Sequence, residues 1–474
     1  MATTPAAEHE PPPQRRSASR IARVARSAPP SRTCLAHAVA AAGVVTLLVC
    51  VGAIWRDSPV RVIENGALGA SAGSALHLPA AYTILSPLCE AYDALTLLTL
   101  PQHAALLGWL LATFAAIRAA RWVRRGREAI DIRSAWRRAG REMFLFAAVV
   151  MGFAIVYVAG AIVPRPMAGL VLDDRDELAV DVHSHTSESH DGRPGFDAEA
   201  NRRWHSAAGF AGAYITDHRK YEGAIAGARG NPPTAGDGTV LLPGIELAAP
   251  HSHVTILGAR PEMRLDDNGQ VDSARVAAAQ GVVIVLTVPV GLSGVPRTLG
   301  LNAVEVSDGA PRGLLFTRRM APAIVRFAAS RGLVAVAGSN NHGWGRTASA
   351  WTVLRIPGWR ALSPDSLDRA IRSTLLHGSN AVRVVARASV ALPRSAFALV
   401  TTPALLIWSI VTRLSTAERV SWLVWGWSVA MVALVFARRV DPVDSGDHAL
   451  PSASSLPHDY WYRDRARRRA RQRG

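Results

Sequence analysis

The chain has long apolar spans near both ends and short apolar runs in its middle. A membrane-spanning helix needs about 20 mostly apolar residues, and five stretches have this character: 35–55, 94–117, 143–163, 396–412 and 420–437. The first is too long for the core of a signal peptide, so we expect a retained helix. Pro101 predicts a kink in the second, although residues 80–117 also leave room for two shorter segments.

Residues 167–390 follow a different pattern, in which short apolar runs alternate with helix-like stretches. The helix-like stretches cover 197–208, 273–280, 317–330 and 364–376 and carry cap residues such as Asp197 and Gly332. Several apolar runs are nearly continuous Val, Ile, Leu and Ala, which is typical of parallel strands covered on both faces. The alternation predicts an α/β barrel whose active site lies at the carboxyl ends of the strands. Seven runs are expected to be strands: 178–182, 212–216, 240–247, 253–257, 282–288, 303–306 and 333–337.

Composition divides the chain into five parts. The first is rich in Pro, Ala, Ser and Arg, and the last is polar and Arg-rich, so both are expected to be disordered tails. We expect these tails at 1–33 and 439–474, a membrane region of about three helices at 34–166, the α/β domain at 167–390 and a two-helix membrane region at 391–438.

The net charge of +17 comes almost entirely from Arg, since Lys220 is the one Lys in the sequence. Positive residues in short loops beside membrane helices mark the cytoplasmic side, and nine Arg lie between residues 118 and 141. With this loop and the N-terminal tail inside, the third span places the α/β domain outside the cytoplasm, in a multi-pass protein of the cytoplasmic (inner) membrane. Five spans would also leave the Arg-rich C-terminal tail outside, which conflicts with the same rule.

Composition also narrows the chemistry and the partners. The three cysteines, Cys34, Cys50 and Cys89, all lie in or beside the N-terminal apolar region, so neither a disulfide framework nor a thiolate zinc site is expected. Intramembrane charges beyond Glu90 and Asp93 are lacking, which argues against a transporter. No nucleic acid partner is expected, because attraction to anionic membrane lipid explains the Arg-rich tail more simply. The oligomeric state stays open.

The strongest chemical signal is the stretch 181–192, D-V-H-S-H-T-S-E-S-H-D-G, which follows an apolar run. Alternate residues of a strand point to the same side, so His183 and His185 can present two imidazoles to one cation. Asp191 could fold back as a third ligand at the turn that ends at Gly192. His190, in the same stretch, is expected to be a bystander, as is His205.

Similar residues follow other apolar runs. One histidine after a strand is more often a satisfied polar residue than a ligand, but recurrence at successive strand ends of one barrel predicts convergence on one pocket. Imidazole and carboxylate ligands without thiolates suit Zn, Mn or Fe, and several of them suit two or three ions. The candidate metal ligands are His183, His185, Asp191, His218, Glu246, His253, Asn340 and His342.

The ordered motifs D-V-H-S-H-T-(x)4-D-G, I-T-D-H, P-G-I-E with a downstream H-V-T-I-L-G, and S-N-N-H resemble those of the polymerase and histidinol phosphatase (PHP) metal-dependent hydrolases. Within that family they are most similar to the branch that includes carbamate hydrolases. The resemblance covers residues 178–376. It implies a distorted seven-stranded (β/α) TIM-like barrel, here flanked by N- and C-terminal transmembrane α-helices.

The resemblance also implies roles for individual residues. His183 and His185 would hold a first metal, and Glu246 would bridge it to a second that His253 also binds. A third metal would lie among Asp191, His218 and His342. Asp181 and Asp217 would orient the imidazoles as outer carboxylates. Glu246, Asp217 and Arg346 are the candidate catalytic residues, with Arg219, Lys220 and Arg346 placed to clamp an anionic oxygen or simply solvated at the surface.

Two positions depart from the family pattern. Val288 stands where the family has a histidine at the end of the fifth strand, and Asn340 replaces an aspartate. His251 could substitute for the missing histidine if it shares a strand face with His253. The sequence therefore predicts a membrane-anchored phosphoesterase acting on a small-molecule or phosphoester substrate through metal-activated water. An amide or carbamate hydrolase and a non-catalytic metal- or ligand-binding sensor are the alternatives.

Overall fold

The computed structural model describes residues 32–64, 67–70, 73–124, 132–287 and 292–438. Contacts between residues divide the chain into two units, residues 45–425 and a second unit made of residues 1–44 and 426–474. The whole α/β domain and the candidate site belong to the first of these. The expected tails at 1–33 and 439–474 lie outside the described residues, apart from residues 32 and 33.

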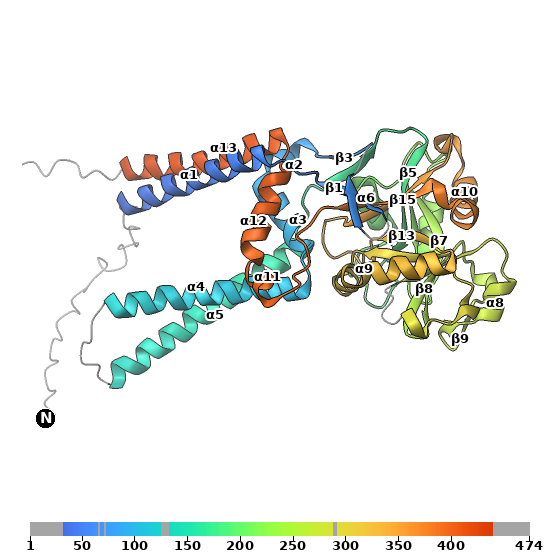
Figure 1. The fold of residues 1–474 in the computed structure, drawn as a ribbon, viewed down its shortest axis with the longest axis horizontal. Coiled ribbons are helices and arrows are strands. Elements are labelled where there is room, and N and C mark those ends of the chain that lie inside the picture. The colour runs from blue at the N-terminus through green and yellow to red at the C-terminus, as the bar shows by residue number, and fades with distance from the viewer. Residues whose placement is uncertain (1–31, 65–66, 71–72, 125–131, 288–291, 439–474) are drawn as a thin grey trace, which may run out of the picture. The chain divides into compact units, whose positions relative to one another are not determined.

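One thirteen-stranded sheet forms the centre of the α/β domain, shown on the right of Figure 1. Its main strand order is β13-β12-β11-β8-β7-β6-β5-β14-β15-β1-β2. The seven expected apolar runs all form strands of this sheet. They are β5 (Glu177–Ser184), β6 (Gly212–Ile215), β7 (Val240–Ala249), β8 (Ser252–Leu257), β11 (Val283–Thr287), β12 (Ala303–Asp308) and β13 (Val334–Gly338). Two small strands, β9 (Asp266–Asp267) and β10 (Gln270–Val271), branch from β7.

The sheet curls until its β13 end approaches β5. The Asn340 amide, just after β13, donates to the His183 carbonyl oxygen at 2.7 Å. The Thr352 hydroxyl of β14 (Ala350–Arg355) accepts from the Ala337 amide at 2.8 Å and donates to the Ala337 carbonyl oxygen at 2.9 Å. Side chains and loop backbone thus complete the closure that a strand ladder would make in a regular barrel. The result is a mixed α/β curled sheet, compatible with the expected distorted barrel.

The expectation of parallel strands is wrong for β8, which runs antiparallel to both β7 and β11. The chain reverses through the two residues between β7 and β8, with His251 at a positive φ of 61°. The start of β8 therefore lies at the rim where the parallel strands end. His253 stands opposite Ala248 of β7 and Thr287 of β11.

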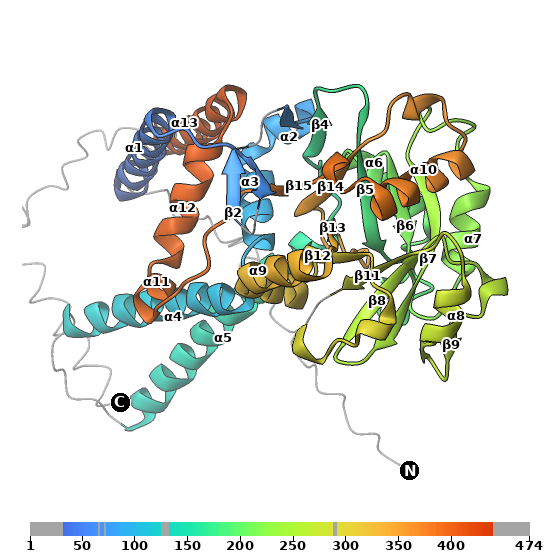
Figure 2. The same ribbon diagram turned by 45° about the vertical axis from the view of Figure 1, so that its right-hand side comes forward.

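Five helices pack on the sheet: α6 (Ala198–Ala207), α7 (Glu222–Arg229), α8 (Ser273–Ala278), α9 (Pro311–Arg331) and α10 (Pro364–His377). Asp197 caps α6 as expected, accepting the Ala200 amide at 2.7 Å. Helix α9 starts earlier than expected, at Pro311, because proline suits the first helical position. Buried residues such as Ile324 of α9 and Ile371 of α10 join the strand side chains in the two largest core clusters. Figure 2 shows α9 lying along β12.

Residues before the expected domain boundary at 167 also belong to this sheet. Strand β1 (Val60–Glu64) pairs antiparallel with β15 (Val382–Arg387), and β2 (Ala67–Ala70) follows β1. Val60 and Val62 are buried in a cluster with Trp351 and Val385. A separate ribbon joins β3 (Ser74–His77) to β4 (Gly169–Leu172). The segment after the first apolar span is therefore part of the α/β domain.

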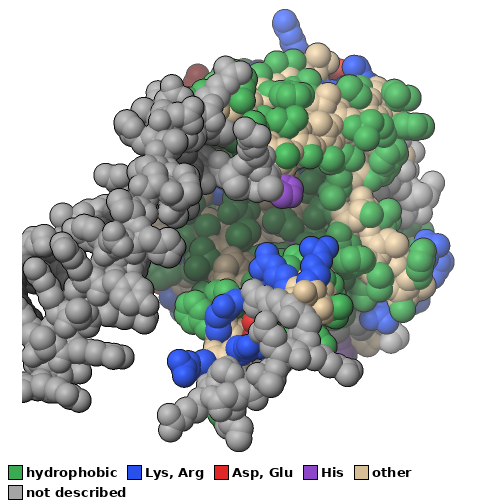
Figure 3. Space-filling view, turned by 90° about the vertical axis from the view of Figure 1, so that its left-hand side faces the viewer, with side chains coloured by type: hydrophobic (Ala, Val, Ile, Leu, Met, Phe, Trp, Pro, Cys, Tyr) green, Lys and Arg blue, Asp and Glu red, His purple; other side chains and the backbone are tan. Residues whose placement is uncertain are grey.

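Among the described residues, four helices are long and apolar enough to cross a membrane. They are α1 (Arg32–Ile54), α4 (Leu100–Arg124), α5 (Ile132–Ile162) and α13 (Thr416–Arg438). Hydrophobic side chains cover much of the described surface on the face drawn in Figure 3. An ion pair between Arg118 Nε and Glu142 Oε2, 2.6 Å apart, joins α4 to α5.

Two expected spans are corrected. Residues 396–412 form two short helices, α11 (Ala396–Val400) and α12 (Thr402–Arg413), because Pro403 begins a new helix instead of continuing the old one. Residues 94–117 do not form one kinked helix either. Helix α3 (Ser86–Thr96), which follows α2 (Ala80–Ile84), ends before Pro101, and α4 begins at Leu100. Pro101 therefore marks a helix start, where its missing amide hydrogen costs nothing.

Candidate metal centre

Glu246 is the centre of the candidate site and contacts four imidazoles. Its carboxylate, buried at 2% exposure at the end of β7, lies 3.2 Å from Nε2 of His183 and 3.2 Å from Nε2 of His185. It lies 3.3 Å from Nδ1 of His218 and 2.9 Å from Nδ1 of His253. The structure thus brings together the residues expected at the first and second metals. The antiparallel course of β8 is what delivers His253 to this rim.

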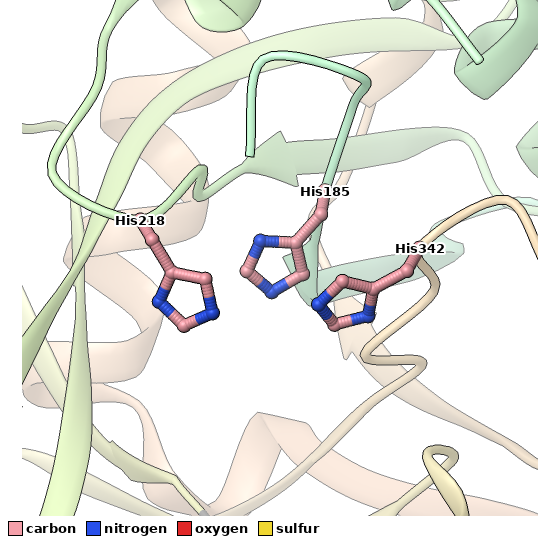
Figure 4. A group of neighbouring side chains, drawn as sticks. All are labelled: His185, His218 and His342. Carbon is pink, nitrogen blue, oxygen red and sulfur yellow. The ribbon is translucent and has the colours of Figure 1, made fainter. Parts of the chain in front are cut away.

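A second group forms a row of three imidazoles, with His185 between His218 and His342 (Figure 4). The ring centroids of His185 and His342 are 4.1 Å apart, and those of His185 and His218 are 4.9 Å apart. Asp191 Oδ2 lies 3.1 Å from Nε2 of His342 and 3.6 Å from Nε2 of His218. The expected third-metal ligands therefore meet. Burial lowers the pKa of His185 to about 3, which keeps its imidazole in the neutral form that binds metals.

Five sets of three side chains place one potential ligand atom each within 4.8 Å of one another. Two of these sets contain residues that the sequence interpretation missed or set aside. His190 joins Asp191 and His218, and Glu305 and Asp308 of β12 join His183. The remaining three sets are His183, His185 and Glu246; His218, Glu246 and His253; and His185, His218 and His342.

Glu305 and Asp308 are fully buried at the end of β12, where Oε1 of Glu305 lies 2.9 Å from Nδ1 of His183. Burial raises the pKa of Glu305 to about 7 and that of Asp308 to about 6. The sequence signal was a glutamate inside the apolar run at 303–306, because a carboxylate seldom occupies such a position without a partner. A cation beside these carboxylates would offset the cost of burying them.

Several buried polar atoms around Glu246 have no hydrogen-bond partner within the described chain. They are both ring nitrogens of His185, Oε2 of Glu305, Oδ1 of Asn340 and Nε2 of His342. Nε2 of His185 and Nε2 of His342 lie 3.2 and 3.1 Å from carboxylate oxygens of Glu246 and Asp191, but without the geometry of a hydrogen bond. Buried polar atoms are normally paired, so a cluster of unpaired acceptors is informative. All are atoms that coordinate divalent cations, and the donor set fits such ions without thiolates.

Asn340 adopts a positive φ of 45° and donates from Nδ2 to Oδ2 of Asp308 at 3.1 Å. Its unpaired Oδ1 is the atom that could approach a cation, in agreement with the expected neutral ligand. We expect Asn340→Asp to tighten divalent metal binding by about tenfold, because the site gains a charged ligand. The metal-free chain should lose thermal stability, since the new carboxylate faces Asp308.

Calorimetric titration with Mn²⁺, combined with melting curves with and without the metal, measures both effects of Asn340→Asp. Ser339→Ala serves as the control, because this change on the same loop alters no carboxylate. Unchanged affinity in Asn340→Asp would show that residue 340 lies outside the coordination sphere.

Residues 288 and 251 are the two positions considered for a further ligand of the second metal. Val288 lies outside the described residues. His251 does not share a strand face with His253, because β8 begins at Ser252 and His251 occupies the preceding turn. The condition under which His251 could substitute for the missing histidine is therefore not met. The His251 ring instead packs against Gly294, where an added Cβ would lie 2.5 Å from Cδ2 of His251.

The Asp181 and Asp217 carboxylates accept hydrogen bonds from the backbone of segments that carry the candidate ligands. Asp181 Oδ1 accepts the amides of His183 at 3.1 Å and Ser339 at 2.9 Å, and Oδ2 contacts Nε2 of His205 at 2.7 Å. Asp217 accepts the Thr186 amide at 2.6 Å and the Thr186 hydroxyl at 2.7 Å. Both therefore accept backbone amides of these loops and contact one further side chain each, whereas the expected contact was with the ligand imidazoles. His205 is the buried partner of Asp181.

Arg346 is not part of the lining of the cavity over the site. The positive charges of Arg165 and Arg193 lie near its guanidinium. The arginine that lines the cavity is Arg312 of α9. Lys220 Nζ lies 4.0 Å from Glu188 Oε2, as expected for a surface charge.

The cavity has a volume of about 1120 Å³ and is lined by Leu100, Asp191, His218, Glu246, His251, Ser252, His253, Ala310, Pro311, Arg312, Gly313, Leu315, Phe316, Asn340 and His342.

No family model and no curated protein matches this chain. Among solved structures, PsfC from Pseudomonas syringae has a TM-score of 0.33 and 18% identity, over 49% of this chain and 96% of that protein. The lesion-specific endonuclease PfuEndoQ from Pyrococcus furiosus has a TM-score of 0.29 and 12% identity, over 42% and 56%. An amidohydrolase from Chromobacterium violaceum has a TM-score of 0.24 and 17% identity, over 39% and 98%.

The structural similarity to these three proteins is low, and the description of the candidate metal centre depends on the geometry of this chain alone. The fold and the site define an α/β protein with a curled sheet, whose rim carries clustered histidine, glutamate and aspartate side chains that could hold metal ions.

Proposed function

We propose that the chain is a membrane-anchored, metal-dependent hydrolase of the PHP type that cleaves phosphoesters. The observation that carries this proposal is the buried Glu246 carboxylate among four imidazoles, with unpaired ligand atoms around it. A buried carboxylate among four imidazoles, with unpaired polar atoms around it, is a poor structural element on its own, since unpaired polar groups cost stability. The same arrangement is well suited to two or three Zn, Mn or Fe ions.

Different residues of the chain would bind the metal ions and the anionic substrate. Bound divalent ions would polarise the phosphoryl oxygen and lower the pKa of a nucleophilic water. Glu246 holds the imidazoles of His183, His185 and His253 at one point of the rim. The Arg312 guanidinium lines the same cavity and suits an anionic oxygen. Helix α9 begins beside it with no side-chain cap on its first turn, and its dipole also favours negative charge.

The choice of a phosphoester over an amide or a carbamate rests on this positive edge of the cavity. A neutral amide needs no cation beyond the metal centre, whereas a phosphoester keeps at least one negative charge throughout hydrolysis. The neutral Asn340 favours a second candidate, a metal- or ligand-binding sensor without turnover, because it lowers the charge of the ligand set.

Four spans give a consistent membrane topology, which five did not. If the N-terminal tail lies in the cytoplasm and α1, α4 and α5 each cross the membrane, the Arg-rich segment around 125–131 would lie inside and the α/β domain outside. Helix α13 then returns the Arg-rich tail at 439–474 to the cytoplasm. Strand β1, between α1 and α4, falls on the same outer side as its partner β15. We therefore propose an extracytoplasmic catalytic domain on a multi-pass inner-membrane protein.

Chelation provides the direct test of activity. We expect the purified full-length chain to hydrolyse bis(4-nitrophenyl) phosphate, and a chelator to reduce the rate by at least about a hundredfold, because metal chemistry supplies several kcal/mol of transition-state stabilisation. Adding back Mn²⁺, Zn²⁺ or Fe²⁺ singly should restore the rate and identify the ion. A rate that survives exhaustive chelation would contradict a metal-dependent mechanism, and stable metal binding without turnover would favour the sensor.

A further inference from the structure

The cavity over the metal centre has two unlike sides. One carries the polar residues of the rim, among them His218, Glu246 and His342. The other side is apolar and is built by Leu315 and Phe316 of α9 together with Leu100. A site for a small polar substrate needs no such wall, because apolar surface left in contact with water in the complex contributes nothing to binding.

Leu100 is the first residue of α4, one of the four helices apolar enough to cross a membrane. The corner before it is anchored to the same helix that lines the cavity, because Arg318 Nη1 donates to the Leu97 carbonyl oxygen at 2.8 Å. Leu97 and Leu98 are buried at 3% and 2% exposure, while Leu100 remains 50% exposed. The apolar side of the cavity therefore joins the end of a candidate membrane helix.

The size of the cavity supports a large occupant. Pockets for drug-sized ligands usually measure about 300–1,000 Å³, and this cavity measures about 1120 Å³. A phosphoryl group between the metal rim and Arg312 would fill only a part of it. The remaining space, next to Leu100, Leu315 and Phe316, suits a hydrocarbon chain, whose burial is favourable by the hydrophobic effect.

We propose that the substrate is a membrane amphiphile, a phosphoester carrying a hydrocarbon chain, that enters the cavity beside the start of α4. This inference rests on the proposed hydrolase function and adds the substrate class to it. The phosphoester lies between the rim and Arg312, and the hydrocarbon chain lies on the apolar wall. Hydrolysis breaks one P–O bond and forms another to the oxygen of water, and a proton of that water goes to the leaving oxygen.

The test compares two substrates that differ in chain length alone, ethyl and octyl 4-nitrophenyl phosphate, below their aggregation concentrations. The full-length chain is held in phospholipid nanodiscs so that no free detergent competes. We expect kcat/KM to be at least about tenfold higher for the octyl compound, since each fully buried methylene is worth about fourfold in binding. Binding of ethyl- and octylphosphonate, measured by calorimetry on the metal-loaded chain, should show the same preference.

Three variants separate the cavity from simple partition into the lipid. Leu100→Ser and Phe316→Ser should lower the octyl-to-ethyl ratio of kcat/KM by about tenfold. Ile225→Ser, at an exposed apolar residue of α7 outside this cavity, should keep the wild-type ratio. An unchanged ratio in Leu100→Ser and Phe316→Ser would assign the preference to the lipid particle and overturn the inference.

The outcomes also separate this inference from the function on which it rests. Turnover of both compounds at equal kcat/KM would leave a hydrolase and overturn the amphiphile. Absence of turnover for both compounds would overturn the hydrolase. The phosphonate titration would still decide the ligand class in that case, because equal affinity for the two chain lengths would refute the apolar subsite.

Discussion

Replacing both His183 and His185 by alanine is expected to reduce phosphodiester hydrolysis by at least about a thousandfold, because the change removes two of the four imidazoles proposed to hold metal beside Glu246. Both imidazoles are fully buried, so the expected loss does not come from a change of the protein surface. The variant should also lose most of its bound metal. The measurement is kcat/KM on bis(4-nitrophenyl) phosphate together with metal content per chain.

The matched control for this variant is His377→Ala at the end of α10, which belongs to none of the ligand sets. It should keep both metal and activity. Circular dichroism must show that the double variant remains folded, since truncating two buried side chains also leaves cavities. A folded double variant with wild-type turnover would remove these histidines from the mechanism.

Asp93→Asn is expected to lower the free energy of unfolding by about 3–5 kcal/mol, the usual cost of breaking a buried ion pair from one side. Asp93 is completely buried in α3, and its two carboxylate oxygens each lie 2.5 Å from an arginine, Arg165 and Arg387. The hydroxyls of Tyr82 and Thr347 also donate to it, at 2.8 and 2.7 Å. The amide would leave two arginines with too little negative charge.

The pH dependence of this effect has a defined sign. Burial alone would raise the pKa of Asp93, but Arg387 and Arg165 hold it below the ordinary value. A carboxyl group with a depressed pKa stabilises the folded state above its unfolded pKa, near 3.9, and this contribution disappears as the pH falls through the folded value. The difference between wild type and Asp93→Asn should therefore be full at neutral pH and shrink in acid.

Thermal and urea melts of the full-length chain measure the cost of Asp93→Asn. Asp267→Asn on β9 is the control, because Asp267 is exposed and its replacement should change stability by less than about 0.5 kcal/mol. Equal melting of the two variants would mean that the buried ion pairs contribute no net stability.

The sequence predicted seven of the thirteen strands of the sheet, because each of these is a short apolar run with polar ends, and it missed β1, β2, β9, β10, β14 and β15. It indicated the candidate ligands His183 and His185 for a similar reason, since they stand two residues apart on a strand and both reach Glu246. The direction of β8 was missed, because a two-residue reversal at residues 250–251 leaves no mark in the hydrophobic pattern. That reversal explains how His253, at the start of a strand, reaches a rim made of strand ends.

The sequence interpretation missed other residues of the candidate site for different reasons. Glu305 was counted as part of an apolar run, although its burial beside His183 is what makes it a candidate ligand. Arg346 was chosen by proximity in sequence to His342, whereas Arg312 reaches the cavity through the start of α9. The apolar wall at Leu100, Leu315 and Phe316 joins segments more than 200 residues apart, which sequence periodicity does not report.

Residues 396–412 illustrate the limit of composition as a guide to membrane spans. The stretch is apolar enough, but Pro403 divides it into helices of 5 and 12 residues, too short to cross a bilayer. Without this span, the number of candidate membrane helices is four, an even number, instead of the expected five. In the proposed four-span topology, the Arg-rich tails share one side of the membrane and β1 and β15 share the other.

The metal content of the purified full-length chain tests the central claim most directly. After loading with Mn²⁺, Zn²⁺ or Fe²⁺ and removal of free ions, elemental analysis should find two or three ions per wild-type chain and fewer than one in Glu246→Gln, because Glu246 contacts four imidazoles at once. The full complement of ions in Glu246→Gln, or none in the folded wild-type chain, would contradict a metal centre at this rim.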